Sequence, residues 1–406
     1  YMNKEKCVAW FICDISSKTT LSAHSFTILK LKENFDNFFI INLHHLKYPN
    51  KYKNINNQSN TEIDKETNVT TFKPKNFTEL KNFTNNKNIL GIINFGVRYS
   101  DIKLHFLLNF LKIKFFQISN IGGSSWSFNT EKELSVFKRL KFKFGRFSYY
   151  LIILLSNLKI LPKTEVKFLS NLKIINAIKN SSIKKFLFKL NLFYSKKLEL
   201  INSRSYDISI LNEFEVKEDN IVLLDLQLDH EDDKKIGHKN TKEKTLKHYE
   251  KLNEILSRLS KIFNKPVVVT IHPTDDLNKK KEIFPEYEVV KYNTVENIYK
   301  GFLILFFDST AIIDAFILKK KIITIKSKFT GQLPKDGSDK YKNEAGVLQI
   351  NLDSEISKEN ILDKEIFIEK LNNNIKYYDE YIKQTIAPDG SEPGYKKIVR
   401  VMNNYF

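Results

Sequence analysis

The chain has 406 residues, of which 42% are hydrophobic and 13% aromatic, and its formal net charge at pH 7 is +19. This composition is typical of a folded protein and excludes a largely disordered chain, and the length favours two domains. The two cysteines, Cys7 and Cys13, lie on one expected strand, which excludes both a disulfide framework and a cysteine-based zinc site.

The first half of the chain shows a strand–helix–strand pattern twice. The expected elements are strand 8–13, helix 23–33, strand 38–43, strand 89–95, helix 101–111 and strand 114–118. The polar stretch 51–88 between the two patterns is expected to be a long loop with one short helix at most.

Positive charge is concentrated in the middle of the chain. Between Val136 and Leu200 there are fifteen Lys and Arg residues and two Glu, interspersed with Phe, Leu and Ile at helix-like intervals. We therefore predict a basic helical region at 131–200. Such helices bind anionic membrane surfaces, and a solvated basic face is the equally weighted alternative. Nucleic acid is not an expected partner, because no recognition-helix, RNP or zinc-finger pattern occurs.

The second half alternates strands and helices in the way that a parallel sheet demands. The expected elements are strand 221–226, helix 241–263, strand 267–271, strand 288–292, helix 295–300, strand 302–307, helix 311–318, strand 321–326, strand 347–352, helix 366–383 and helix 394–403. Asn293 and Glu296 predict a capping box for the helix at 295–300. The segment Arg204–Asp207 is expected to be the crossing between two domains.

Two short polar motifs follow buried strands of the second half. His272-Pro273 follows strand 267–271, and Asp308-Ser309-Thr310 follows strand 302–307. Ligands of open α/β sheets bind outside the carboxyl ends of the strands, where helix N-termini offer free N–H groups to a phosphate. We expect the motifs at neighbouring sheet positions, binding a nucleotide phosphate. Each also has a structural explanation, because Pro starts segments and Ser and Thr cap helices.

A third polar stretch follows strand 221–226. Asp225 interrupts an apolar run, and a carboxylate there needs a partner or a ligand. Asp225, Gln227 and His230 are therefore candidate donor-binding residues. The acidic cluster at 229–233 is more typical of a solvated loop than of a metal site, so neither a metal nor a cofactor is expected. No G-x-G-x-x-G or G-x-x-x-x-G-K motif occurs, which argues against dinucleotide oxidoreductases and P-loop ATPases.

These motifs resemble, in their order, those of bacterial surface-carbohydrate biosynthesis proteins, which look like GT-B-type glycosyltransferases. The resemblance covers roughly residues 200–330 and rests on Arg204-Ser205-Tyr206-Asp207, Val222–Asp225, His230-Glu231-Asp232, Thr270–Pro273 and Asp308-Ser309-Thr310. The His-Pro and hydroxyl motifs are also similar to those of bacterial sialyltransferases, which implies that His272, Ser309 and Thr310 hold the phosphate of CMP. Two features depart from these families. The surface-carbohydrate proteins have His-Pro-Asp at positions 230–232, and the acidic motif of sialyltransferases does not occur in the first half.

The expected fold is therefore α/β, with two Rossmann-like domains facing a cleft in the GT-B manner and a basic helical insertion in the first. We expect an acceptor domain at 1–205, a nucleotide-sugar-binding domain at 206–385 and a C-terminal helix at 386–406. Asp14, which follows the first strand, is the candidate base that takes the proton of the acceptor hydroxyl. The turn at Gly122, Gly123 and Ser124 is the candidate acceptor side.

The expected activity is sugar transfer from a CMP- or UDP-linked donor to a bacterial surface glycan, such as lipopolysaccharide or capsule, with a lipid-linked glycan as acceptor. Inversion without a metal is expected. The alternatives are a polyol-phosphate transferase with a CDP-linked donor and a catalytically inactive glycan-binding or assembly partner of the same fold. No signal peptide or membrane-spanning run is recognised, which predicts a cytoplasmic protein, with peripheral attachment to the inner face of the cell membrane.

Overall fold

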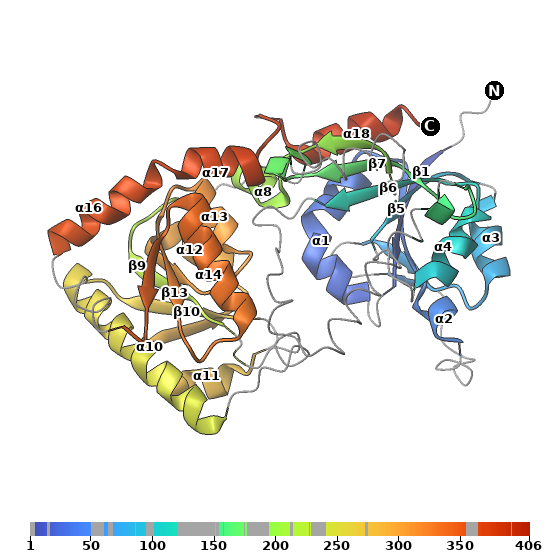
Figure 1. The fold of residues 1–406 in the computed structure, drawn as a ribbon. Coiled ribbons are helices and arrows are strands. Elements are labelled where there is room, and N and C mark those ends of the chain that lie inside the picture. Colours follow the sequence, from blue (N-terminus) through green and yellow to red (C-terminus); the bar gives the residue numbers. More distant parts are fainter. Residues whose placement is uncertain are drawn as a thin grey trace. The chain divides into compact units, whose positions relative to one another are not determined.

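The structure is a computed structural model (Figure 1). The residues that it describes are 5–13, 17–49, 61–63, 68–85, 87–94, 101–119, 151, 154–156, 158–173, 175, 176, 195–211, 214–226, 228, 241–272, 275–354, 364–390 and 392–406. The chain forms two compact units. The first holds Tyr1–Asn120, Ser135–Asp207 and Pro388–Phe406, and the second holds Ile121–Leu134 and Ile208–Ala387.

The first unit is built on an eight-stranded sheet with the order β3-β4-β2-β1-β5-β6-β7-β8, which is parallel except that β3 pairs antiparallel with β4. The strands are β1 (Lys6–Ile12), β2 (Asn37–Asn42), β3 (Thr61–Ile63), β4 (Thr70–Phe72), β5 (Asn88–Ile93), β6 (Lys114–Ser119), β7 (Thr164–Leu169) and β8 (Ser195–Leu200). The helices are α1 (Ser17–Lys32), α2 (His44–Lys47), α3 (Phe77–Asn85), α4 (Ile102–Asn109) and α18 (Gly394–Asn403).

Both faces of the first sheet are covered, which explains why β1 is apolar from Cys7 to Ile12. Val8, Trp10 and Ile12 face a core that includes residues of α1 and α18. Cys7, Ala9 and Phe11 face the other core, to which α3 and α4 contribute. The period of two along a strand therefore divides its side chains between two helical layers.

The second unit is built on a six-stranded, fully parallel sheet with the order β11-β10-β9-β12-β13-β14. The strands are β9 (Asn220–Leu224), β10 (Val267–Ile271), β11 (Glu288–Lys291), β12 (Gly301–Phe306), β13 (Lys321–Lys326) and β14 (Leu348–Asn351). The helices are α10 (Lys242–Phe263), α11 (Leu277–Ile283), α12 (Thr294–Lys300), α13 (Ile312–Ile317), α14 (Gln332–Ala345), α16 (Lys364–Ile375) and α17 (Tyr378–Thr385). Helix α8 (Arg204–Leu211) contains the division between the units, after Asp207.

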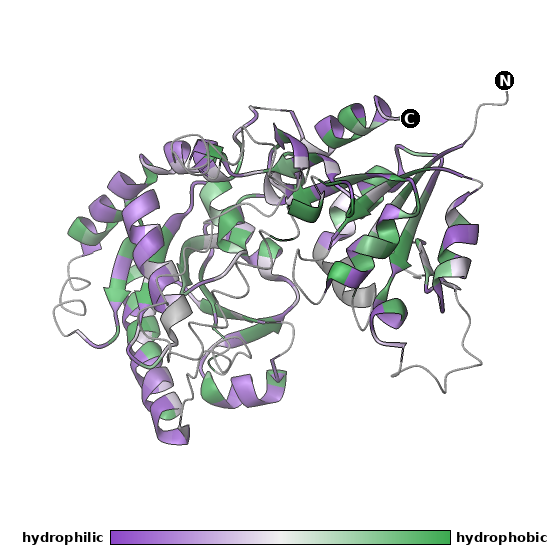
Figure 2. Cartoon of the chain, turned by 45° about the vertical axis from the view of Figure 1, so that its right-hand side comes forward, coloured by the Kyte–Doolittle hydropathy of each residue, from purple (hydrophilic) through white to green (hydrophobic). Residues whose placement is uncertain are grey.

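Helix α10 shows how the sequence produces this packing. Thr241 caps its start by accepting a hydrogen bond from the Lys244 N–H, and Asn264 ends it in a left-handed conformation with φ of 51°. Its apolar side chains recur at helical spacing and face the core of the sheet, namely Leu252, Ile255, Leu256 and Leu259. Figure 2 shows the resulting division, in which the strands are mainly hydrophobic and the helices have mixed hydropathy.

The structure corrects several of the expected elements. Strand β7 lies inside the region 131–200 that was predicted to be helical, and most of that region lies outside the described residues. The stretch expected to be a loop contains β3 and β4 besides α3. Helices α11 and α14 were not expected, and the single helix expected at 366–383 is two helices, α16 and α17. The capping box is also wrong, because Asn293 makes no side-chain cap bond and Glu296 pairs with Lys300 at 2.7 Å.

The C-terminal residues belong to the first unit, although the sequence predicted a separate helix at 386–406. Asn202 donates hydrogen bonds from Nδ2 to the carbonyls of Gly390 and Glu392. Asp207 caps α18 by accepting from the backbone N–H groups of Gly394 and Tyr395. Among the described residues, no helix is long and apolar enough to cross a membrane, and both cysteines are free.

Candidate functional site

The candidate site lies in the second unit, at the edge of the sheet where the strands have their carboxyl ends. His272 follows β10, Asp225 follows β9 and Ser309 follows β12. The expectation that the His272 and Ser309 motifs occupy neighbouring positions is wrong, because β9 lies between β10 and β12. The neighbour of β12 on its other side is β13, which ends just before Ser327. A ligand that touches both motifs therefore crosses the end of β9.

His272 is exposed, and hydrogen bonds link its carbonyl to Asp275 and Asp275 to Lys291. The carbonyl of His272 accepts from the N–H of Asp275 at 2.9 Å. The carbonyl of Asp275 accepts in turn from Nζ of Lys291 at 2.8 Å. An imidazole that is exposed at a strand end can donate a hydrogen bond to a ligand without disturbing the core.

Asp225 is fully buried, and its partner is Lys280 of α11, with which it forms an ion pair. Nζ of Lys280 also donates to the hydroxyl of Tyr249 at 2.6 Å and lies 3.8 Å from Oδ2 of Asp275. Burial lowers the pKa of Lys280, but the neighbouring Asp225 and Tyr249 outweigh it and raise the pKa, so the ammonium stays charged. Lys280 thus connects the end of β9 to α10 and to Asp275, whose N–H donates to the carbonyl of His272.

A buried imidazole supports the end of β13. His248 of α10 is fully buried, and its Nδ1 shares a hydrogen bond of 3.2 Å with the hydroxyl of Ser327. Burial, with a smaller contribution from Lys280, lowers the pKa of His248 to about 4, so the ring is neutral at pH 7. Ser327 in turn orders the following turn, because its Oγ accepts from the N–H of Phe329 and its carbonyl accepts from the hydroxyl of Thr330.

A long helix, α14, packs against the motif that contains Ser309 and Thr310. The N-cap of α13 is Ala311, whose N–H donates to Oγ of Ser309 at 3.3 Å, and Thr310 is exposed. Helix α14 begins after Gly331, at the end of the strand next to β12. A β-carbon on Gly337 of α14 would lie 2.8 Å from Cγ of Asp308, so the helix packs directly against the motif. Hydroxyls next to the N-terminus of a helix suit an anionic ligand.

The remaining candidates lie outside the described residues. They are Asp14, Gly122, Gly123, Ser124, Gln227, His230 and Pro273. No group of three or more His, Cys, Asp and Glu side chains that could hold a metal ion occurs within the described ranges.

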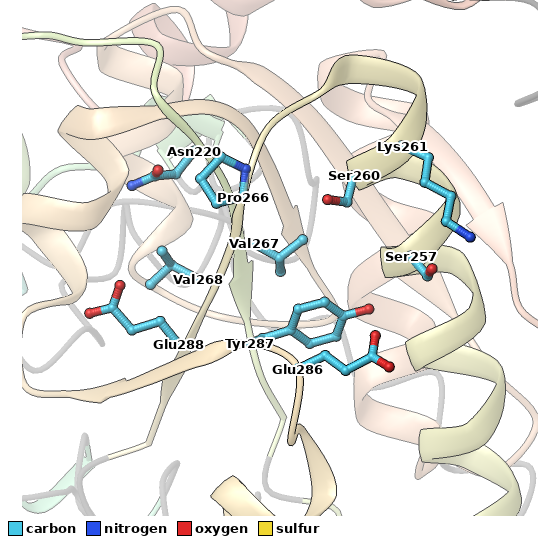
Figure 3. A pocket seen from close by; sticks show the side chains of 10 residues that line it. All are labelled: Asn220, Ser257, Ser260, Lys261, Pro266, Val267, Val268, Glu286, Tyr287 and Glu288. Atoms are coloured by element: carbon cyan, nitrogen blue, oxygen red, sulfur yellow. The ribbon is translucent and has the colours of Figure 1, made fainter.

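A pocket of about 380 Å³ lies at the opposite edge of the same sheet (Figure 3). Asn220, Val267 and Glu288, the first residues of β9, β10 and β11, line it together with residues of α10. Its position at the amino ends of the strands separates it from the candidate site.

Sequence reasoning missed Lys280, Tyr249, His248 and Gly337. Lys280 stands in the polar run Asn278–Lys281, where nothing distinguishes a buried lysine from its exposed neighbours. Helix α14 was not predicted, because Pro334 and Gly337 are both unfavourable inside helices. Pro334 lies in the first turn of α14, where a missing N–H does no harm.

No protein-family model matches the chain, and a comparison with curated proteins finds no match. Solved structures do match. The UDP-GlcNAc 2-epimerase from Methanocaldococcus jannaschii has a TM-score of 0.50 and 13% identity, covering 98% of this chain and 99% of that one. S. aureus MnaA, in a co-structure with UDP, has a TM-score of 0.48 and 11% identity, covering 99% and 96%. A glycosyltransferase from Rickettsia africae ESF-5 has a TM-score of 0.48 and 10% identity, covering 99% and 98%.

Identities this low show the fold alone. The likeness to the archaeal epimerase extends over nearly the whole of both chains, and each unit here is a mainly parallel sheet with helices on its faces. The chain therefore has two Rossmann-like domains, as its sequence predicted, in a fold of the GT-B type.

Proposed function

We propose that the chain is a nucleotide-sugar enzyme that transfers a sugar from a CMP- or UDP-linked donor to a bacterial surface glycan. The observation that carries this proposal is that the Asp308-Ser309-Thr310 motif and the start of α14 follow the neighbouring strands β12 and β13 at the carboxyl edge of a Rossmann-like sheet, where α14 packs against Asp308 at Gly337. Two hydroxyls and a helix N-terminus are groups that bind phosphate oxygens. The likeness in fold to the UDP-GlcNAc 2-epimerase from Methanocaldococcus jannaschii supports a nucleotide sugar as the ligand.

The proposed roles follow from the chemistry of sugar transfer. The bond between the anomeric carbon and the phosphate oxygen breaks, and negative charge develops on the departing nucleotide. Ser309, Thr310 and the N–H groups at the start of α14 stabilise this charge, and His272 donates a hydrogen bond or a proton to the phosphate. The acceptor hydroxyl forms the new glycosidic bond, and its proton passes to a base, for which Asp14 is the proposed residue.

The finer parts of the proposal rest on the sequence. They are inversion at the anomeric carbon, independence from metal ions and a lipid-linked acceptor in surface polysaccharide synthesis. A transferase that moves a polyol phosphate from a CDP-linked donor, and a catalytically inactive glycan-binding partner, are the alternatives on the same fold. An epimerase of a nucleotide sugar is a further candidate, which the likeness in fold to the Methanocaldococcus jannaschii enzyme favours.

Binding of nucleotides to the whole chain tests the site first. A thermal-shift series with CMP, UMP, CDP, UDP and GDP should raise the melting temperature for one base class, because a ligand that binds only the folded state stabilises it. The double variant Ser309→Ala/Thr310→Ala should lose this shift, whereas Lys342→Ala, an exposed change on α14, should keep it. If the nucleotide raised the melting temperature of both variants by the same amount, the proposed site would be wrong.

Product analysis then separates the activities. A transferase releases free nucleotide from the sugar donor and makes a product only when an acceptor is present, apart from slow hydrolysis to a free sugar. An epimerase converts the nucleotide sugar into an isomer without an acceptor, and a polyol-phosphate transferase releases a polyol phosphate on hydrolysis. Nucleotide binding without turnover of any donor would favour the inactive partner.

A further inference from the structure

The outward face of α4 in the first unit carries large apolar side chains. Leu104, His105 and Leu108 are buried, as expected for a helix that covers a sheet. Phe106 is 44% exposed and Phe110, which ends the helix, is 52% exposed. Their rings contact each other, with centroids 4.9 Å apart. A helix on a sheet normally presents polar residues to water, so α4 departs from the usual pattern.

A second segment extends this apolar face. Leu154, Leu158 and Ile160 are 47%, 60% and 42% exposed. The segment is fastened to α4 by Asn109, whose Nδ2 donates to the carbonyls of Lys159 and Ile160 at 3.2 Å each. These bonds place the second segment beside α4, and we define the α4 surface as the exposed apolar residues of both, namely Phe106, Phe110, Leu154, Leu158 and Ile160. Apolar residues scattered singly over a protein need no explanation, but a group such as this marks a site of interaction.

The charges that border the α4 surface are positive. Lys103 and Lys112 at the two ends of α4 are exposed, as is Lys159 in the second segment. The described residues of 102–119 and 151–164 include no Asp or Glu. Asp101, just before α4, is buried and pairs with Lys47 at 2.5 Å.

Among the described residues, the nearest carboxylates in the sequence on either side have partners of their own. Glu79 of α3, the helix whose Phe77 contacts Phe110, is partly buried and accepts from the N–H of Lys75 at 2.9 Å. Glu165 of β7 pairs with Lys196 at 2.6 Å. The α4 surface thus combines apolar side chains with lysines that no exposed carboxylate among these residues offsets.

We propose that the α4 surface docks onto a lipid bilayer that contains anionic headgroups. Apolar side chains flanked by lysines bind such a boundary, because the rings enter the interface while the ammonium groups meet the phosphates. A second copy of the chain suits the surface less well, because pairing like with like would bring Lys103, Lys112 and Lys159 against the same lysines of the partner. The proposal does not depend on the proposed enzymatic function.

Vesicle binding by the full chain tests the proposal. The chain should sediment with vesicles of phosphatidylcholine and phosphatidylglycerol and much less with phosphatidylcholine alone, and salt should release it as screening shortens. Phe106→Ser/Phe110→Ser should lower the partition coefficient about tenfold or more, since burying a single Phe side chain corresponds to at least that factor. Lys103→Glu/Lys159→Glu should weaken binding to the anionic vesicles only.

The matched control is Ile366→Ser/Tyr377→Ser, which removes two side chains of the second unit that are 49% and 61% exposed. It should bind vesicles like the unchanged chain. Far-UV circular dichroism and melting temperature establish that each variant is folded, which is expected because all the changed side chains are exposed. Equal binding by the control and the phenylalanine variant would overturn the proposal. So would a dimer, seen by sedimentation velocity, that the phenylalanine changes dissociate without any vesicle binding.

Discussion

Gly337 of α14 stands against the carboxyl group of Asp308, so close that a β-carbon at position 337 would lie 2.8 Å from Cγ and 2.9 Å from Oδ1. A glycine in the middle of a 14-residue helix lowers helix stability by roughly 1 kcal/mol relative to alanine. The close approach explains its presence, because only glycine lets α14 lie on the motif that ends in Ser309 and Thr310.

Gly337→Ala should therefore separate stability from ligand binding. The new methyl group displaces the short side chain of Asp308, while the gain in helix propensity offsets part of the strain, so we expect a melting temperature within a few degrees of the original. Nucleotide affinity should fall, because the motif moves relative to the start of α14. Isothermal titration calorimetry measures this change, with Lys342→Ala on the same helix as the control. Unchanged affinity would place Asp308 and α14 outside the site.

His272→Ala should abolish or greatly reduce turnover while leaving the fold intact. The side chain is exposed at the end of β10, so its removal leaves no buried cavity. Loss of a hydrogen bond to a developing phosphate charge lowers the rate constant by roughly 100-fold. Steady-state kinetics with the donor found by the thermal-shift series provides the measurement. Normal turnover by folded His272→Ala protein would show that this residue does not act on the phosphate.

Activity should persist in EDTA. The proposed site meets the phosphate charge with two hydroxyls, an imidazole and the N-terminus of α14, a set of groups that can act without a divalent cation. Donor turnover is measured after dialysis against EDTA and again after addition of magnesium or manganese. Activity that is lost in EDTA and restored by either ion would contradict metal independence. It would not contradict the proposed nucleotide site.

Several strands were predictable from the sequence to the residue or nearly so. β10 and β13 have the expected bounds, because a parallel strand buried on both faces is mainly apolar, as in Val267–Ile271 and in Ile322–Ile325 with its flanking lysines. β7 was missed, although Thr164, Val166 and Phe168 are buried and alternate with partly buried residues. Its lysine-rich surroundings favoured a helix, but the period of two is the signal that the folded chain follows.

The position of the candidate site was predictable in part. The carboxyl edge follows from the parallel sheet, but strand order does not follow from chain order, which is why β9 was not expected between β10 and β12. The unusual carboxylate at Asp225 was recognisable from its apolar neighbours. Its partner Lys280 comes from a helix 55 residues later, and no local pattern encodes such a contact.

Lys280→Met should destabilise the chain strongly. The change leaves the buried carboxylate of Asp225 without its counterion, and breaking a buried ion pair in this way lowers the free energy of unfolding by about 3–5 kcal/mol. Asp225→Asn/Lys280→Met should cost less than the sum of the two single changes, because no uncompensated charge remains. Urea denaturation measures the cycle, with the exposed neighbour Lys281→Met as the control. Strict additivity would show that the pair is not coupled.

The free energy of unfolding should fall as the pH drops through the range set by His248. Its pKa is about 4 in the folded chain, against 6.5 for a histidine exposed to water, so between these values the unfolded chain binds more protons. The contribution of neutral His248 to the free energy of unfolding is fully present above pH 6.5 and is lost as the pH falls towards 4. For a pKa shift of this size it amounts to roughly 3 kcal/mol. His248→Asn removes this titration but keeps every carboxylate, so the difference in free energy of unfolding between the two proteins should shrink from pH 7 to pH 4.5. Urea denaturation at a series of pH values measures it, and a difference that stays constant would show that His248 does not titrate in this way.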